Sequence, residues 1–239
     1  MTSALTPAAT SERPLLTPIT RPDDETCPPL GPRLTAEFIG TFLLVLTVCT
    51  ATSPKHGAGE LAPLAIGSVL MVMVFAGGHI SGGHYNPAVS TAVLLRGKLA
   101  ISDWSSYVGV QLAAATVGGL LARAINGPAH AFPLGSTWKI LAVEFVFTFA
   151  LAYVVLNVAT SRATEGNSYF GLAIGFTVAA GAFAVGGISG GAFNPAVALG
   201  ASVLGIFTWS HYWIYVVATL LAAGVAAKTY LYMQPRERR

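Results

Sequence analysis

Charged residues are scarce in this chain. Lys, Arg, Asp and Glu make up only 10% of its 239 residues, whereas they make up about 25% of the residues of a typical soluble domain. Hydrophobic residues make up 54%, and the mean hydropathy is +0.64. These values exclude an ordinary soluble domain, and we expect an integral, multi-pass membrane protein.

Cysteines and the usual marks of catalysis are scarce as well. The two cysteines, Cys27 and Cys49, are too few for a disulfide framework. The sequence has no phosphate-binding glycine loop, no nucleophile beside a base and no cluster of metal ligands. We therefore expect no enzyme activity, no cofactor and no metal site.

The chain does contain an internal duplication. Residues 78–89 read GHISGGHYNPAV and residues 186–197 read GGISGGAFNPAV, so nine of twelve positions are identical when Gly78 is aligned with Gly186. Each copy follows one long apolar run and precedes another. This self-similarity indicates two structural repeats, one in each half of the chain.

Each copy predicts a short helix that begins inside the membrane. Asparagine is a preferred N-cap, and proline is tolerated in the first turn because the amide it lacks would be unpaired there. We interpret both Asn-Pro-Ala boxes as such helix starts: Asn86, Pro87, Ala88, Asn194, Pro195 and Ala196.

The glycine-rich approaches to these boxes predict a pore. Non-helical backbone survives at membrane depth only where protein buries it or where it lines a wet cavity. Without a Cβ, glycine lets carbonyl groups face a narrow passage. We expect six carbonyl groups to do so: those of Gly82, Gly83, His84, Gly190, Gly191 and Ala192.

Six apolar segments approach the roughly 20 residues that a helix needs to cross a bilayer. They are residues 34–50, 61–77, 104–125, 138–158, 169–185 and 210–232. With three spans per repeat, the second repeat enters the membrane from the opposite side. The predicted fold class is an all-α membrane protein with six transmembrane helices and two re-entrant half-helices in an inverted repeat, whose asparagine ends meet near the midplane.

Basic residues predict the orientation. With the N-terminus inside, ten of the thirteen Lys and Arg residues lie in inner segments, so the positive-inside rule places both termini in the cytoplasm. We interpret residues 1–32 as a disordered cytoplasmic tail and residues 233–239 as a basic cytoplasmic tail that binds no nucleic acid. The expected partner is the lipid bilayer of the cell membrane, plasma or inner.

Two acidic residues lie well inside the apolar spans. Glu37 opens the stretch EFIGTF and Glu144 opens EFVFTF, so the two are repeat mates. A carboxyl group in a bilayer should face the protein interior and have a partner. One hypothesis is a proton relay. The other, which we favour, is a structural acceptor for loop amides that the broken helices expose.

Two histidines flank the first glycine pair. His79 and His84 are five residues apart, which is compatible with metal binding or a pH gate. Neither has a cysteine or carboxylate close to it in sequence. Hydrogen bonding within the loop is therefore the favoured interpretation.

Together these motifs resemble those of the aquaporin (major intrinsic protein) family. The resemblance rests on the doubled Asn-Pro-Ala box, the Ser-Gly-Gly approaches, the twin Glu-Phe-x-x-Thr-Phe starts and the six spans. It covers residues 33–232, with repeats at about 33–126 and 137–232. It implies a homotetramer with one pore per protomer, passing water or small neutral solutes passively and excluding ions and protons.

The resemblance also implies a constriction on the outer side of the boxes. Its four positions, carried over by their distance from each box, are Ile66, Ala182, Gly191 and Val197. Most members of the family have arginine directly after the second box, so this chain resembles an atypical member. A wider constriction without a fixed positive charge predicts passage of hydrogen peroxide, urea, ammonia or glycerol together with water.

Two other functions stay open beside the passive channel. Secondary active transporters are also built on inverted repeats, although they need a site for a coupling ion. A structural or junctional membrane protein can use the same fold with an occluded pore, because a fold does not imply a function.

Overall fold

The computed structural model describes residues 28–238, and all regular secondary structure within this range is helical. Six helices are long: α1 (Leu30–Ala51), α2 (Ala62–Ser81), α4 (Ile101–Asn126), α5 (Thr137–Ala159), α6 (Phe170–Ser189) and α8 (Tyr212–Met233). Two helices are short: α3 (Pro87–Leu95) and α7 (Pro195–Leu204). The described chain also contains 3-10 turns at Gly59–Leu61, Arg162–Thr164, Trp209–His211 and Pro235–Arg238.

The six long helices can cross a membrane. Each contains at least 20 residues, and all six are apolar enough to qualify as spans. Because a helix rises 1.5 Å per residue, 20 residues extend about 30 Å, the thickness of the hydrocarbon core of a bilayer. The predicted all-α, six-span fold class is confirmed.

Two helices end well past the predicted C-terminal ends of their spans. α2 and α6 each run four residues past the predicted ends at residues 77 and 185, to Ser81 and Ser189. The glycines in these turns are not helix breakers. A Cβ at Gly77 would collide with the Tyr85 hydroxyl group, so close packing against the following loop is what requires glycine in the last turns of α2.

The first helix begins inside the segment that the sequence assigns to a tail. α1 starts at Leu30, and Pro32 lies in its first turn. Proline is tolerated there because the first amides of a helix have no intrahelical acceptor. Residues 1–27 of the predicted tail lie outside the described residues.

The sequence assigns residues 233–239 to a basic C-terminal tail, and the described part of this segment folds against the protein. The turn Pro235–Arg238 lets Glu237 bury its carboxylate against Arg96, with 2.6 Å between Oε2 and Nη2. Its Oε1 accepts a hydrogen bond from the Arg162 amide at 2.8 Å. These partners lie 141 and 75 residues away along the chain, which is why no local sequence pattern predicts them.

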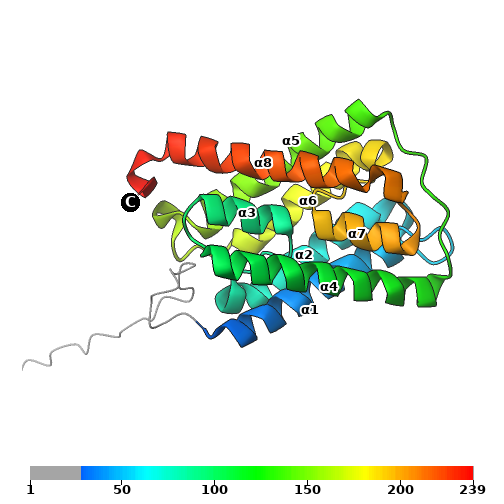
Figure 1. The fold of residues 1–239 in the computed structure, drawn as a ribbon, viewed down its shortest axis with the longest axis horizontal. Coiled ribbons are helices and arrows are strands. Elements are labelled where there is room, and N and C mark those ends of the chain that lie inside the picture. Colours follow the sequence, from blue (N-terminus) through cyan, green and yellow to red (C-terminus); the bar gives the residue numbers. More distant parts are fainter. Residues whose placement is uncertain (1–27, 239) are drawn as a thin grey trace, which may run out of the picture.

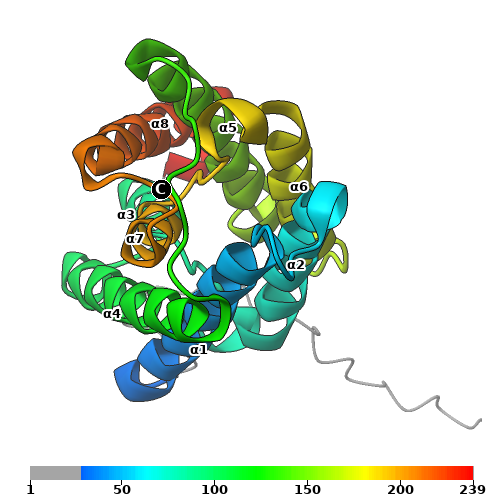
Figure 2. The same ribbon diagram turned by 90° about the vertical axis from the view of Figure 1, so that its right-hand side faces the viewer.

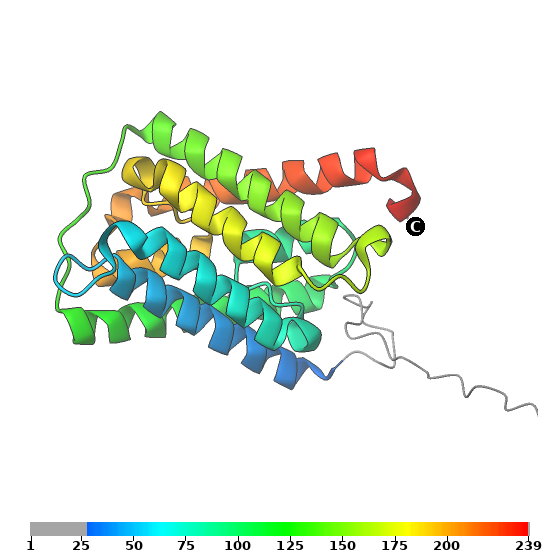
Figure 3. The ribbon, with the colours of Figure 1, turned by 180° about the vertical axis from the view of Figure 1, so that it is seen from behind.

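The two repeats interlock. In the first repeat α1 packs on α2 and α4, and in the second α5 packs on α6 and α8. Helices α2 and α6 join the repeats, while α3 packs on α8 and α7 packs on α4. The end-on view in Figure 2 shows α3 and α7 between α4 and α8. Figure 3 shows the start of α1 and the C-terminus at the same end of the molecule, as an even number of spans requires.

The two short helices meet end to end. Figure 1 shows α3 in one half of the molecule's length and α7 in the other. Asn86 and Asn194 cap them with nearly the same backbone dihedrals, φ −158° and ψ 118° against φ −161° and ψ 118°. The side-chain amide of Asn86 reaches the Phe193 carbonyl at 3.0 Å, which brings the N-termini together. The predicted pair of re-entrant half-helices is therefore present.

Candidate functional site: a pocket where the half-helices meet

The two approach loops use the same left-handed backbone. The residues with positive φ are Gly82 (90°), Gly83 (62°), Tyr85 (49°), Gly190 (83°), Gly191 (64°) and Phe193 (48°). Glycine adopts such angles at little cost, whereas Tyr85 and Phe193 are strained by them. Each loop therefore needs fixed partners that hold its backbone in place.

Glu37 on α1 holds the first loop. Its carboxylate is fully buried. Oε1 accepts hydrogen bonds from Ser81 Oγ at 2.7 Å and from the His84 amide at 2.9 Å. Oε2 accepts from the Tyr85 amide at 2.7 Å and from Gln111 Nε2 at 2.9 Å. The carboxylate thus satisfies loop donors that have no helical acceptor.

Glu144 on α5 holds the second loop in the same way. Oε1 accepts from Ser189 Oγ at 2.6 Å and from the Ala192 amide at 3.0 Å, and Oε2 accepts from the Phe193 amide at 2.7 Å. Neither carboxylate lines the pocket described below. This geometry favours the structural interpretation of both glutamates over a proton relay.

The repeats differ in one polar cluster beside the first loop. Ser90 Oγ lies 3.1 Å from His84 Nδ1 and accepts a hydrogen bond from Gln111 Nε2 at 3.0 Å. The corresponding positions of the second repeat are occupied by Ala192, Ala198 and Thr219. A side-chain network thus ties the first loop to α4, and within residues 28–238 the second loop has no equivalent network to α8. The sequence offers a signal for this difference, since His84 is paired with an alanine.

The two asparagines cross-link the half-helices and present donors to the centre. Asn86 Oδ1 accepts from the Ala88 amide, and Asn194 Oδ1 accepts from the Ala196 amide, both at 2.8 Å. Asn194 Nδ2 donates to the Tyr85 carbonyl at 2.9 Å, which mirrors the bond of Asn86 described above. An amide group has two N–H donors. One hydrogen of each asparagine therefore stays available to a molecule in the pocket.

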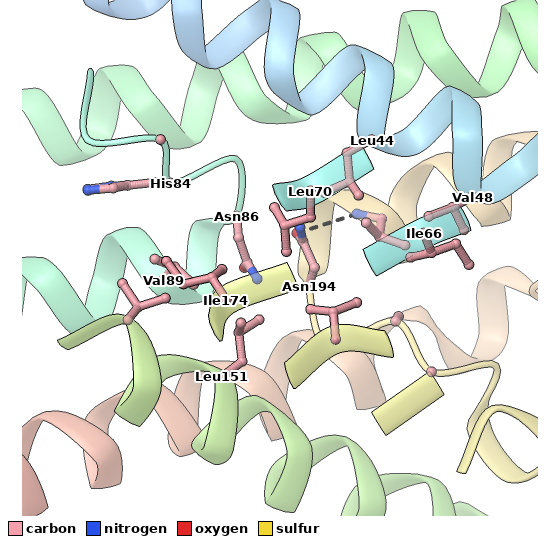
Figure 4. A pocket seen from close by; sticks show the side chains of 16 residues that line it. Leu44, Val48, Ile66, Leu70, His84, Asn86, Val89, Leu151, Ile174 and Asn194 are labelled. Atoms are coloured by element: carbon pink, nitrogen blue, oxygen red, sulfur yellow. Dashed lines mark hydrogen bonds between the residues drawn. The ribbon is translucent and has the colours of Figure 1, made fainter. Parts of the chain in front are cut away.

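A pocket lies at this meeting point. Both asparagines lie on its wall (Figure 4). Among the six carbonyl-bearing residues predicted to line a pore, Gly83, His84, Gly191 and Ala192 line the pocket. Gly82 and Gly190 instead terminate α2 and α6 as left-handed C-caps.

The four positions assigned to a constriction fall on and behind this wall. Ile66, Gly191 and Val197 line the pocket. Ala182 is not among the lining residues, and its Cα lies 3.3 Å from where a Cβ on Gly191 would be. The remaining wall is apolar and comes mainly from α1, α2, α5 and α6. Sequence reasoning did not identify Leu44 and Val48 or their counterparts on α5 as lining residues.

The pocket wall has no charged side chain. The two histidines of the first loop occupy different environments, since His79 is exposed and His84 is buried. Within residues 28–238 no group of three or more His, Cys, Asp or Glu side chains is placed to hold a metal ion. The wall therefore contains hydrogen-bonding groups and hydrocarbon, which suits a small neutral molecule.

Comparison with known proteins agrees with this geometry. Residues 28–78 and 67–230 match the major intrinsic protein family. The chain belongs to this family, that of the aquaporins. Family membership supports a transmembrane channel for water and small solutes, and it argues against an enzyme.

Several named aquaporins are similar to this family member. Aquaporin NIP1-3 from Oryza sativa subsp. japonica is 35% identical over 209 residues, which cover 83% of this chain and 72% of the relative. Aquaporin TIP1-2 from Musa acuminata is 36% identical over 214 residues, which cover 82% and 83%. The X-ray structure of the aquaglyceroporin from Plasmodium falciparum has the same fold, with a TM-score of 0.70 at 21% identity over 84% of this chain and 96% of that chain.

Proposed function

We propose that this aquaporin-family protein is a passive channel for water and for small neutral solutes such as hydrogen peroxide, urea, ammonia and glycerol. The observation that carries the proposal is the uncharged pocket at the junction of the half-helices, with Asn86 and Asn194 on its wall. Each asparagine has a spare N–H, and the carbonyl-bearing residues beside it offer acceptors. A neutral molecule with O–H or N–H groups can therefore exchange hydrogen bonds as it passes.

The choice of solute follows from the residue after the second box. Val197 lies on the pocket wall, where most of the family has arginine according to the resemblance described above. Valine offers no fixed charge and no hydrogen-bonding group. A permeating polyol or amide then meets hydrocarbon at this position, and its passage is decided by size.

Ion exclusion is part of the proposal. Helices α3 and α7 point their N-termini at the same place, and each terminus carries about half a positive elementary charge. The wall has no carboxylate to offset this field. A cation would lose hydration at the narrowest polar point without gaining a negative partner, so it is repelled.

The proposal also includes a homotetramer in the cell membrane, as the family resemblance implies. Large apolar side chains are exposed on the outer faces of the long helices, for instance Phe176 and Phe183 on α6 and Leu221 on α8. Lipid or neighbouring protomers must cover such surface. Cross-linking in native membranes is the direct test of the number of copies.

The proposed function is tested with purified protein in liposomes. Light scattering after an osmotic step with sucrose measures water flux, and steps with glycerol or urea measure solute flux. We expect both to exceed protein-free liposomes, and to persist without any ion gradient. Water passage with refusal of every solute would remove the solute part of the proposal. No passage of water or solute by folded protein would favour the occluded structural alternative.

Substitution of Val197 by arginine is the sharpest prediction of the proposal. Arginine adds length and a fixed positive charge to the wall, so we expect glycerol and urea flux to fall by at least about tenfold, equivalent to about 1.4 kcal/mol in the barrier. Water should be affected less, because it is smaller. Val197→Met, which has length without charge, separates the two causes. Unchanged glycerol flux in Val197→Arg would contradict the assignment of this position.

A further inference from the structure

Every residue that lines the pocket has its repeat mate on the pocket wall as well. Eight residues of the first half and eight of the second line it, and aligning α1 with α5 and the first box with the second pairs every one of them. Leu44 matches Leu151 in this alignment, and Ile66 matches Ile174. Six of the eight pairs are identical in residue type; Leu70 with Val178 and His84 with Ala192 are the exceptions.

Two of the four positions assigned to the outer constriction, Ile66 and Val197, have identical counterparts on the other side of the asparagines. The mate of Ile66 is Ile174, and the mate of Val197 is Val89. Val89 and Val197 each occupy the third position of their half-helix, directly after the Asn-Pro-Ala box. Ile66 and Ile174 each lie in the first turns of a long helix that runs toward the box of its own repeat.

The close-up view places Val89 and Ile66 on different sides of the asparagine pair. In Figure 4, His84 and Val89 lie on one side of the asparagine pair, and Ile66 and Val48 lie on the other. The residues of each repeat pair are also buried to a similar extent. Val89 and Val197 are 3% and 5% exposed, and Ile174 and Ile66 are 4% and 8% exposed.

We propose that Val89 and Ile174 form an inner constriction equivalent to the outer pair Val197 and Ile66. The protein would then select solutes at two apolar constrictions in series, one on each side of the asparagines, and Val89 would be a specificity-determining residue. This inference rests on the proposed channel function. It follows from chemistry: identical side chains with similar confinement impose similar barriers on the same solute.

Two constrictions in series make a quantitative prediction. Their resistances add, so removing one of two equal resistances raises flux by no more than about twofold, whereas removing both raises it further. A single outer filter behaves differently. With a single outer filter, widening the outer position alone gives the full rise in solute flux, and widening the inner position gives no rise.

The experiment compares glycerol flux in liposomes for Val89→Ala, Val197→Ala and the double variant. We expect each single variant to raise glycerol flux to a similar extent, by at most about twofold. The double variant should exceed the product of the two single effects, because two equal resistances in series always give that excess. The inference is overturned if Val197→Ala matches the double variant while Val89→Ala has no effect.

A matched control is available on the same half-helix. Val93 on α3 is fully buried but does not line the pocket, and its counterpart in the second repeat is Ala201. Val93→Ala should leave glycerol flux unchanged. An increase like that of Val89→Ala would mean that loosened packing, not a wider constriction, raises the flux, and it would refute the inference.

Narrowing variants cover the case in which an alanine variant fails to fold. Val89→Ile and Val197→Ile add one methylene at either end, and we expect equal losses of glycerol flux with smaller losses of water flux. A loss in Val197→Ile alone would overturn the inference. The proposed function has its own readout, because it fails if the unmodified protein passes neither water nor solutes. The inner constriction fails instead if substitutions of Val89 and Val197 change glycerol flux differently.

Discussion

At the scale of single residues, the buried glutamates hold the two approach loops in place. Glu37 and Glu144 convert two loops with left-handed, partly strained backbone into fixed structures by accepting their amide hydrogens. Because both carboxylates lie in apolar spans, their hydrogen-bond donors have no alternative partner in lipid. The sequence shows that the pair exists, and the structure shows which donors it satisfies.

Loss of either carboxylate should destabilise the protein. Glu37→Ala removes the acceptor of four hydrogen bonds, which come from Ser81 Oγ, the amides of His84 and Tyr85, and Gln111 Nε2. Each buried, unsatisfied donor costs about 1–3 kcal/mol, so we expect a lower thermal midpoint in detergent. Glu144→Ala removes the acceptor of three hydrogen bonds and should lower the thermal midpoint less.

The control for this comparison is Glu60→Ala, which alters an exposed loop residue and should leave the midpoint unchanged. The proton-relay hypothesis makes the opposite prediction for the buried glutamates. If Glu37→Gln and Glu144→Gln kept full thermal stability and lost only pH-dependent flux, the structural account of these residues would be refuted.

At the scale of elements, one close contact between the repeats is the crossing of α2 and α6. A Cβ on Gly67 would lie 2.6 Å from the Gly175 carbonyl oxygen, and a Cβ on Gly175 would lie 2.5 Å from the Gly67 carbonyl oxygen. Both contacts are with backbone, which cannot move aside cheaply. Without hydrophobic attraction between helices in lipid, such close packing is what holds the crossing together.

Alanine at this crossing should separate the two helices. We expect Gly67→Ala and Gly175→Ala to destabilise the protein by about 1–3 kcal/mol, as overpacking of a core does, and to shift glycerol flux because Ile66 and Ile174 are the neighbouring wall residues. Thermal unfolding and liposome flux measure the two effects. Gly109→Ala is the control, because nothing lies within 4 Å of its Cβ. A crossing that tolerates alanine as readily as Gly109 would contradict this role.

The second element-scale feature is the C-terminal turn. Glu237 receives two contacts from the guanidinium group of Arg96, at 2.6 Å to its carboxylate and 2.8 Å to its carbonyl oxygen, and this guanidinium lies 5.0 Å from the Tyr230 ring centroid. Arg96 caps the C-terminal end of α3. The turn therefore connects the end of α8 to the half-helix that carries the first box.

Breaking this buried ion pair should be costly. Removal of one partner leaves an uncompensated buried charge, so we expect Glu237→Ala and Arg96→Ala each to destabilise the protein by about 3–5 kcal/mol. The double variant should cost less than the sum of the two, since no lone charge remains. Thermal unfolding of all three variants measures this coupling. Arg236→Ala, at an exposed neighbour, should be neutral, and additive single effects would mean that the pair contributes no coupling.

At the scale of the whole molecule, the inverted repeat sets the topology. The start of α1 and the C-terminus share one end of the molecule (Figure 3), and α3 and α7 occupy opposite halves of its length (Figure 1). The distribution of basic residues predicts which end of the molecule faces the cytoplasm. The loop that contains Glu60 should face outward, and the loop that contains Glu165 should face the cytoplasm.

Cysteine labelling tests this orientation. In a chain that carries Cys27→Ser and Cys49→Ala, the variants Glu60→Cys and Glu165→Cys place one thiol in each exposed loop. A membrane-impermeant maleimide added to intact cells should label the first and should label the second only after lysis. Labelling of Glu165→Cys in intact cells would reverse the assigned orientation.

Four features can be predicted from the sequence alone: the six spans, the duplicated boxes, the two helix starts and the presence of two glutamates that are repeat mates. All of these are local or repetitive signals: apolar runs of spanning length, Asn-Pro at an N-cap, and identity at a constant offset. A single sequence is sufficient to reveal them, because each signal lies within a few residues or recurs unchanged.

Three further features could not be predicted and required the folded chain: which apolar residues face the pocket, where α2 and α6 end, and how the C-terminal turn docks. The spans are apolar on every side, since lipid is as apolar as the protein interior, so no periodicity distinguishes Leu44 on the pocket wall from a lipid-facing residue such as Phe176. The Arg96–Glu237 pair joins positions 141 residues apart. Such choices depend on how helices are rotated and packed against each other, which only the folded chain specifies.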